Sequence, residues 1–285
     1  MKKNLFVTIA VCITIAACMN ETDNEYLSEQ EENVSLTENA MTNFLDVMGI
    51  NPSTPNLTFH DIIIIDDAVG GCCCGSGQTG YKDLSNAVIL SLITPLIQDS
   101  MSTSPLPGTL QDQQLINPES QSLTNNVPAS PLNGNSYTFN DSIGYYHNLI
   151  ISEILENDPY GDSLFAMNFP LIVRMVDNQI EQMFGLSYGY FHAIGYDLEQ
   201  ISMCEKISYI LHNYTDGYSF LSLLTAEFPT LHLLANYIVG LSQGDMSYTS
   251  MNQALNSIPT LQLPSVTEQM KKITLIEYAS NKLWR

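Results

Sequence analysis

The C-terminal half of the chain carries apolar residues at a spacing that a helix places on one face. Between 143 and 155 they stand three or four positions apart, at Ile143, Tyr146, Ile150, Ile151, Ile154 and Leu155, with His147 among them. This period lines side chains along one side of an α-helix, where they are buried together. Similar patterns predict helices at 170–184, 198–213, 219–241, 247–256 and 265–283. We therefore expect a mainly α fold with a helical body over residues 142–285.

Helix-breaking and helix-capping residues indicate where these predicted helices begin and end. Pro229 lies inside the segment 219–241 and should kink or split it, because proline lacks the amide hydrogen and clashes with the preceding turn. Asp197, Ser247 and Ser265 are candidate N-caps, since their side-chain oxygens accept hydrogen bonds from the amide groups of a first helical turn.

The N-terminal half has a less regular pattern. A short amphipathic helix is predicted at 39–48 and a buried apolar helix at 84–97. The run Ile62–Ile65 consists of β-branched residues between acids, which favours a short buried strand, although a helix continuing into Ala68 and Val69 fits the same residues. The segment around 40–98 is therefore predicted to be small and hydrophobic.

The remaining segments are predicted to connect the folded parts. Residues 18–39 are acidic and poor in apolar side chains, which predicts a disordered tether. Residues 99–141 are rich in Ser, Pro and Asn, which predicts a long irregular linker between the segment 40–98 and the helical domain 142–285.

Charge and composition exclude several classes of protein. The 285 residues include 30 acidic and 9 basic side chains, a net charge of −21. Binding nucleic acid through its phosphates needs clustered Lys and Arg, so no nucleic-acid partner is expected. With 45% hydrophobic and 14% charged residues, the chain is too apolar to be wholly disordered. Its apolar runs are too interrupted for a polytopic membrane protein.

The first eighteen residues have the pattern of an export signal. Lys2 and Lys3 precede a mostly apolar stretch that ends at Ala17. This stretch is too short to cross a hydrocarbon core of about 30 Å, and its length suits the apolar region of a signal peptide. It ends in Ile15-Ala16-Ala17-Cys18, which resembles the lipobox of bacterial lipoproteins. The alternatives are an ordinary signal peptide with a chance cysteine and a membrane-anchoring helix.

The lipoprotein resemblance implies a location in the cell envelope. Residues 1–17 would be removed, and Cys18 would become an acylated N-terminus, carrying fatty chains such as palmitate, that binds the membrane through its lipid. The expected location is the outer membrane of a Gram-negative bacterium. Acidic residues at Glu21, Asp23 and Glu25 are similar to sorting signals for surface display, so both the periplasmic and the cell-surface face remain open.

A glycine-rich segment invites comparison with nucleotide-binding loops. Residues 74–79 follow the isoleucine run, as the glycine loop follows a strand in P-loop NTPases. However, Cys72 stands where the first glycine belongs, and Gln78 replaces the lysine that contacts the phosphates. A tight turn or close packing of small residues explains the segment better, and no cofactor is expected.

The cysteines suggest disulfides rather than a metal site. Cys72, Cys73 and Cys74 are consecutive, so their thiols diverge, whereas structural zinc sites space their ligands. With Cys204 they leave four thiols in an exported chain, which allows one or two disulfide bonds. Buried free thiols are the stronger interpretation of these cysteines.

Three residues are candidates for acid–base chemistry. Asp66 and Asp67 follow the isoleucine run, and paired carboxylates can bind a divalent ion, while His147 can act as a base near neutral pH. In an extended strand the two carboxylates would point to opposite faces, and His147 lies on an apolar stripe. A structural role in the core is therefore the stronger interpretation of His147.

The best candidate for a contact surface is an aromatic segment. Tyr188, Tyr190 and His192 lie in a short stretch between Gly185 and Gly195. Tyrosine rings on such a loop can stack on sugars or enter a pocket of a partner protein. Rings that close the end of a helical bundle are the alternative.

These observations favour a non-enzymatic function. We expect a lipid-anchored envelope or cell-surface protein that binds a protein or glycan partner through Tyr188, Tyr190 and His192. The alternative is an envelope hydrolase that uses His147 or the pair Asp66/Asp67.

Overall fold

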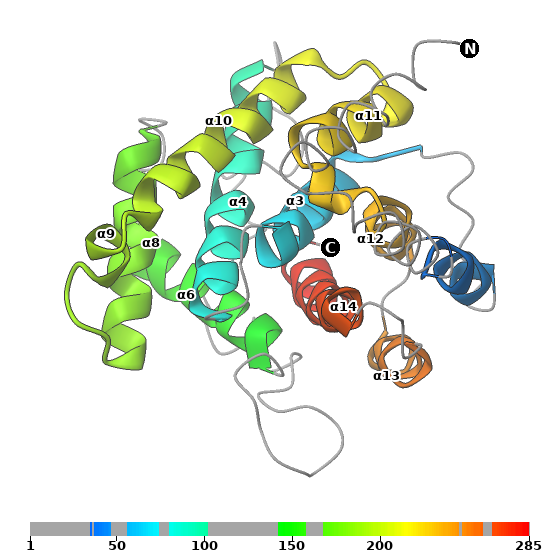
Figure 1. Cartoon of the computed structure of the whole chain (residues 1–285). Helices are drawn as coiled ribbons and strands as arrows, with labels where there is room; N and C mark the ends of the chain where they lie inside the picture. The colour runs from blue at the N-terminus through cyan, green and yellow to red at the C-terminus, as the bar shows by residue number, and fades with distance from the viewer. Residues whose placement is uncertain are drawn as a thin grey trace, which may run out of the picture.

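The computed structural model describes residues 35, 37–46, 56–73, 80–101, 142–157, 168–244, 247–258 and 264–284. Within these ranges the chain is mainly helical and contains no strand (Figure 1). A helical segment at 37–46 precedes the elements α3 (Phe59–Cys73), α4 (Gly80–Met101), α6 (Ile143–Asn157), α8 (Phe169–Phe184), α9 (Tyr190–Ala193), α10 (Tyr196–Asn213), α11 (Gly217–Glu227), η2 (Pro229–Leu231), α12 (Ala235–Ser242), α13 (Tyr248–Ser257) and α14 (Pro264–Trp284).

The mainly α prediction is confirmed, and most helices lie where the apolar spacing placed them. Pro229 splits its helix as expected, because α11 ends before it and α12 begins only after the short turn η2. Ser247 caps α13 by accepting a hydrogen bond from the amide of Ser250 at 3.1 Å. Two cap assignments are wrong, because Gly195 occupies the N-cap of α10, and α14 begins at Pro264 with Ser265 already inside it.

The short strand expected at the isoleucine run is also wrong, because these residues form α3. All four isoleucines, from Ile62 to Ile65, are buried. A helix that is apolar on every side has no amphipathic stripe, so its pattern resembles that of a buried strand. Helices surround this segment, and packing overrides the weak strand preference of β-branched side chains.

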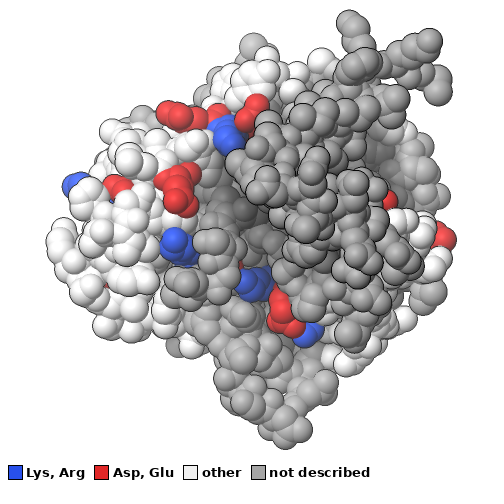
Figure 2. Space-filling model, viewed as in Figure 1, with Lys and Arg blue, Asp and Glu red and all other residues white. Residues whose placement is uncertain are grey.

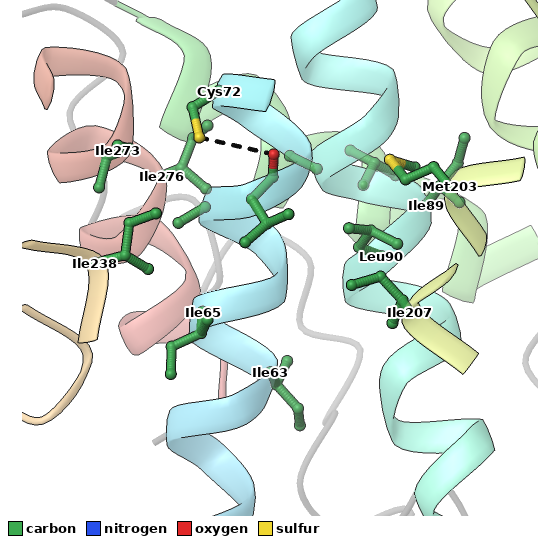
Figure 3. Close-up of a cluster of buried hydrophobic side chains, with 14 of the residues drawn as sticks. Ile63, Ile65, Cys72, Ile89, Leu90, Met203, Ile207, Ile238, Ile273 and Ile276 are labelled. Carbon is green, nitrogen blue, oxygen red and sulfur yellow. Dashed lines mark hydrogen bonds between the residues drawn. The ribbon is translucent and has the colours of Figure 1, made fainter. Parts of the chain in front are cut away.

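The helices α3 and α4 form the centre of the molecule (Figure 1). Helix α3 packs against α4, α12 and α14, while α4 also contacts α6, α8 and α10. A methyl group added at Gly70 would lie 2.7 Å from the backbone of Asn86 and Ala87 in α4. Figure 3 shows Ile65 and Cys72 of α3 between α14 and α4. Other helices therefore cover the α3–α4 pair on both sides.

The segment 40–98 shares one core with the helical domain. Its buried residues belong to the same hydrophobic cluster as those of α6, α10, α12 and α14. The helix at 37–46 joins this cluster too, with the ring of Phe44 5.7 Å from that of Tyr237 in α12. The expected boundaries near 39 and 99 fall inside helices, and residues 102–141 of the expected linker lie outside the described ranges.

Candidate functional site

The aromatic segment forms a turn at one edge of the molecule, where α9 lies beside α8 and α10 (Figure 1). Tyr188 is 87% exposed, and the side chain of His192 is 80% exposed. Tyr190 is partly buried and packs edge-on against Phe191, with ring centroids 5.3 Å apart. Phe191 itself is buried in the core. Tyr188 and His192 thus face solvent, while Phe191 points into the core.

The backbone of this turn is held by a buried carboxylate. Glu181 of α8 accepts hydrogen bonds from the amide of Gly189 at 2.7 Å and from that of Phe191 at 3.3 Å. Its own side chain is buried. Hydrogen bonds to a charged acceptor are among the stronger ones in proteins, so this contact fixes the backbone that carries Tyr188 and Tyr190.

Glycines give the turn its shape. Gly185, Gly189 and Gly195 have φ values of 64°, 74° and 70°, a left-handed conformation that other residues rarely adopt. In the structure they set three sharp bends, and the rings are presented on a fixed backbone.

Further apolar side chains extend the exposed face along the chain. Leu198 at the start of α10 is 70% exposed and Ile194 is 48% exposed. The ring of His192 bonds through Nδ1 to a carboxylate oxygen of Asp197 at 2.7 Å. We call the set Tyr188, Tyr190, His192, Ile194 and Leu198 the Tyr188 surface. Figure 2 shows that the described surface over α8 and α10 is largely uncharged, with scattered acidic and basic groups.

The acid–base candidates lie at a different place, in the interior. Asp66, Asp67 and His147 have no exposed surface. The Nε2 atom of His147 is 3.6 Å from Oδ2 of Asp67, so the structure brings these two residues together across α3 and α6. A substrate would have to reach side chains that are fully enclosed. We therefore place no reaction at this cluster.

Burial shifts the protonation of these groups. Desolvation raises the pKa of Asp66 to about 8, against a hydrogen bond from Thr94 that lowers it. Desolvation also raises the pKa of Asp67, opposed by hydrogen bonds from Ser280 and Ser91. It lowers the pKa of His147 to about 4, because the charged ring is the form that burial penalises. Burial thus favours the uncharged form of all three side chains.

A second polar network joins α4, α8 and α10 and was not predicted from the sequence. Oδ1 of Asp177 accepts hydrogen bonds from Ser85 at 2.6 Å and from Gln200 at 3.0 Å. Desolvation raises the pKa of Asp177 to about 6. Beside it, Asn86 donates to the hydroxyl of Tyr196 at 2.6 Å. The signal in the sequence was a carboxylate on the apolar stripe of a helix, between Val176 and Ile180.

The cysteines of the described part are buried. Cys72 and Cys204 have no bond to each other, and the thiol of Cys72 lies 3.8 Å from the carbonyl oxygen of Val69 (Figure 3). The side chain of Cys73, and all of Cys74 and Cys18, lie outside the described residues. A disulfide that involves Cys73 or Cys74 stays a prediction.

Metal binding and membrane spanning were searched within the described ranges. There, no group of three or more His, Cys, Asp or Glu side chains is arranged to hold a metal ion. Among the described helices, none has the length and apolar character needed to cross a membrane. Comparison with protein-family models, curated proteins and solved structures finds no match to this chain.

Proposed function

We propose that this chain is a lipid-anchored binding protein of a Gram-negative outer membrane, and that the Tyr188 surface contacts a protein or glycan partner. The observation that carries the proposal is the exposure of Tyr188, at 87%, on a backbone held by the buried Glu181. A tyrosine side chain has only two main torsion angles, so it loses little entropy when it binds, and a backbone that is already held adds to this advantage.

Neighbouring side chains support the same role. Leu198 and Ile194 add exposed apolar area, which is the part of an interface that gains most from burial. His192 and Asp197 add a hydrogen-bonded polar pair beside these residues. A surface with an exposed aromatic ring, apolar neighbours and a few polar groups fits the core and rim of a protein contact and also the stacking of a sugar ring.

The anchor in this proposal is the acylated Cys18. It rests on the lipobox pattern Ile15-Ala16-Ala17-Cys18 and on the acidic stretch that follows. The net charge of −21 repels anionic lipid head groups, so attachment would depend on the acyl chains. Cys18→Ser is expected to abolish incorporation of labelled palmitate and to release the chain from the membrane fraction. A Cys18→Ser chain that still fractionates with membranes contradicts the anchor.

The binding surface is tested by photo-cross-linking on intact cells that carry the full chain. A photoreactive benzoylphenylalanine is placed at position 188, and in a matched control at position 209, where Tyr209 is 50% exposed on α10. We expect a cross-linked adduct from position 188 only. Glu181→Ala should reduce the yield several-fold while far-UV circular dichroism stays unchanged, because the backbone that carries Tyr188 loses its two hydrogen bonds.

A glycan array read with the labelled full chain separates the two partner classes. For a glycan partner, Tyr188→Ala should reduce the array signal at least about tenfold, the loss expected for a central contact residue. For a protein partner, the adduct from position 188 has the mass of a polypeptide and the array gives no signal. Equal adducts from positions 188 and 209, or neither an adduct nor an array signal, contradict the proposal.

A further inference from the structure

Two adjacent carboxyl groups of α3 hold the central helices together from the inside. Oδ2 of Asp67 accepts hydrogen bonds from Ser91 of α4 at 3.0 Å and from Ser280 of α14 at 2.5 Å. Oδ2 of Asp66 accepts one from Thr94 of α4 at 2.9 Å. Within the described residues, the second oxygen of each carboxyl group is buried with no hydrogen-bond partner.

The orientation of His147 places its Nε2 atom near the carboxyl group of Asp67. Asn148 donates through its amide nitrogen to the carbonyl of Ala279 at 2.9 Å, which leaves its Oδ1 as the acceptor for Nδ1 of His147 at 2.8 Å. Nδ1 therefore carries the ring hydrogen, and Nε2 of the neutral ring has only a lone pair. Without a further proton, this lone pair would face the carboxylate of Asp67, 3.6 Å away, in a buried site.

We propose that Asp66, Asp67 and His147 form a proton-operated latch, in which protonated carboxyl groups hold α3 between α4, α6 and α14. When the protons are lost, α3 separates from these helices and the centre of the bundle opens. This device is independent of the Tyr188 surface, which lies at the edge of the molecule beside α9.

The net charge of Asp66, Asp67 and His147 depends on how many protons they hold. Transfer of one proton from Asp67 to His147 would leave an ion pair with no net charge. Loss of the second proton, from Asp66, would leave a negative charge among side chains that have no exposed surface, which is costly. Opening of α3 lets water reach the carboxylates and removes that cost.

Other groups that face α3 in the described structure cannot supply the missing positive charge. Helix α14 contributes the buried acid Glu277, one turn before Ser280. Helix α12 contributes Tyr237, whose hydroxyl lies 2.5 Å from that of Thr274. Tyr214, after α10, has a pKa raised by burial and by the charge of Asp66. From α4 come the hydroxyls of Ser91 and Thr94, and η2 has no titratable side chain.

The expected pH range follows from the direction of the shifts. A carboxyl group with a raised pKa in the closed state binds its proton more tightly there than in the open state, so the closed state is lost as pH rises through the raised value. Burial raises the pKa of Asp66 to about 8 from 3.8. Above the ordinary pKa of histidine, 6.5, His147 is neutral in both states and no longer offsets this trend. Opening should therefore increase between pH 6.5 and 8.

Hydrogen exchange of the α3 amides in the full chain measures this opening, with rates normalised to those of unfolded peptides at each pH. Each titrating carboxyl raises the opening constant about tenfold per pH unit, which is about 30-fold between pH 6.5 and 8, and two carboxyls raise it up to about 1000-fold. Helix α13, which has no residue in the cluster, serves as the internal reference and should show no such dependence.

Asp66→Asn and Asp67→Asn each remove one titrating group while keeping the size of the side chain. Each variant should lower the rise in α3 opening by about 30-fold over the same pH range. Asp46→Asn, at an exposed aspartate in the helix 37–46, is the matched control and should leave the wild-type dependence intact. A wild-type chain without pH-dependent α3 opening, or Asp66→Asn and Asp67→Asn chains that keep the full dependence, overturns the latch.

Infrared spectroscopy of the wild-type chain gives a second test if either variant fails to fold. Aspartate labelled with ¹³C should show the carbonyl band of a protonated acid at pH 6.5, and this band should disappear as α3 opens at higher pH. Carboxylate bands alone at pH 6.5 would overturn the latch without any variant.

Discussion

Single residues of one type have opposite environments in this molecule, and burial decides their chemistry. His147 is enclosed between α3 and α6, whereas the side chain of His192 is 80% exposed beside Asp197. Asp66 and Asp67 likewise lie in the interior, while Asp216 lies at the surface, where it caps α11 through the amide of Ser219 at 2.8 Å. The same side chain is a buried core group with a raised pKa in one place and a helix cap in the other.

Replacement of His147 by glutamine tests its role as a neutral core residue. Burial lowers the pKa of His147 from 6.5 to about 4, so the native state excludes a proton that the unfolded chain takes up below pH 6.5. This contribution to stability is present above pH 6.5 and is lost as pH falls to about 4, by about 3 kcal/mol in all. His147→Gln should lack that loss.

Urea unfolding of both chains between pH 4 and 7 provides the measurement. The free energy of unfolding of the wild-type chain, relative to His147→Gln, should decline as pH falls from 6.5. Parallel curves for the two chains would show that the ring takes up its proton equally in the folded and unfolded states.

Among the helices, α3 and α4 approach each other closely at Gly70. A side chain at Gly70 would meet backbone atoms of α4 at 2.7 Å, whereas one at Gly71 would meet the end of the Ile276 side chain in α14. Backbone cannot move aside without shifting a helix, but the end of an isoleucine can rotate. The two adjacent glycines therefore carry different constraints.

Gly70→Ala and Gly71→Ala form a matched pair that tests this packing. Both variants gain up to about 1 kcal/mol from the higher helix propensity of alanine. Gly70→Ala should nevertheless lower the free energy of unfolding by about 2 kcal/mol, because α3 and α4 must separate, and Gly71→Ala should cost less. Chemical denaturation measures both values, and an equal cost at the two positions would contradict the close approach of the helices.

At the scale of the whole molecule, the chain folds around one core, although its sequence suggests two parts. The central helices α3 and α4 come from the N-terminal half, and the helices that surround them come from 142–285. Without the central pair, α6, α10 and α14 would expose the apolar faces that they bury against it. Neither part can bury its apolar surface alone.

A fragment of residues 142–285 is therefore expected to lack a cooperative fold. Thermal unfolding followed by near-UV circular dichroism should show a sharp transition for the full chain and none for the fragment. Added peptide 56–101, which contains α3 and α4, should restore part of the transition. A fragment that unfolds as sharply as the full chain would show that the C-terminal helices form an independent domain.

Most helices of the C-terminal half and the negative charge could be predicted from the sequence alone. Helical periodicity is a local property, so segments such as 143–155 and 170–184 could be identified without knowing their neighbours in space. The helix break at Pro229 and the helix cap at Ser247 are local signals of the same kind. The sequence also singled out Tyr188, Tyr190 and His192 as a group, because they lie within five residues.

Features that depend on distant partners became evident only in the folded chain. The isoleucine run became a helix because other helices enclose it, and Asp67 became a core group because Ser280, 213 positions away, donates to it. The exposure of Tyr188 depends on Glu181 and on the burial of Phe191. Burial and hydrogen-bond partners arise from contacts between segments far apart in the chain, and a local sequence pattern does not predict these contacts.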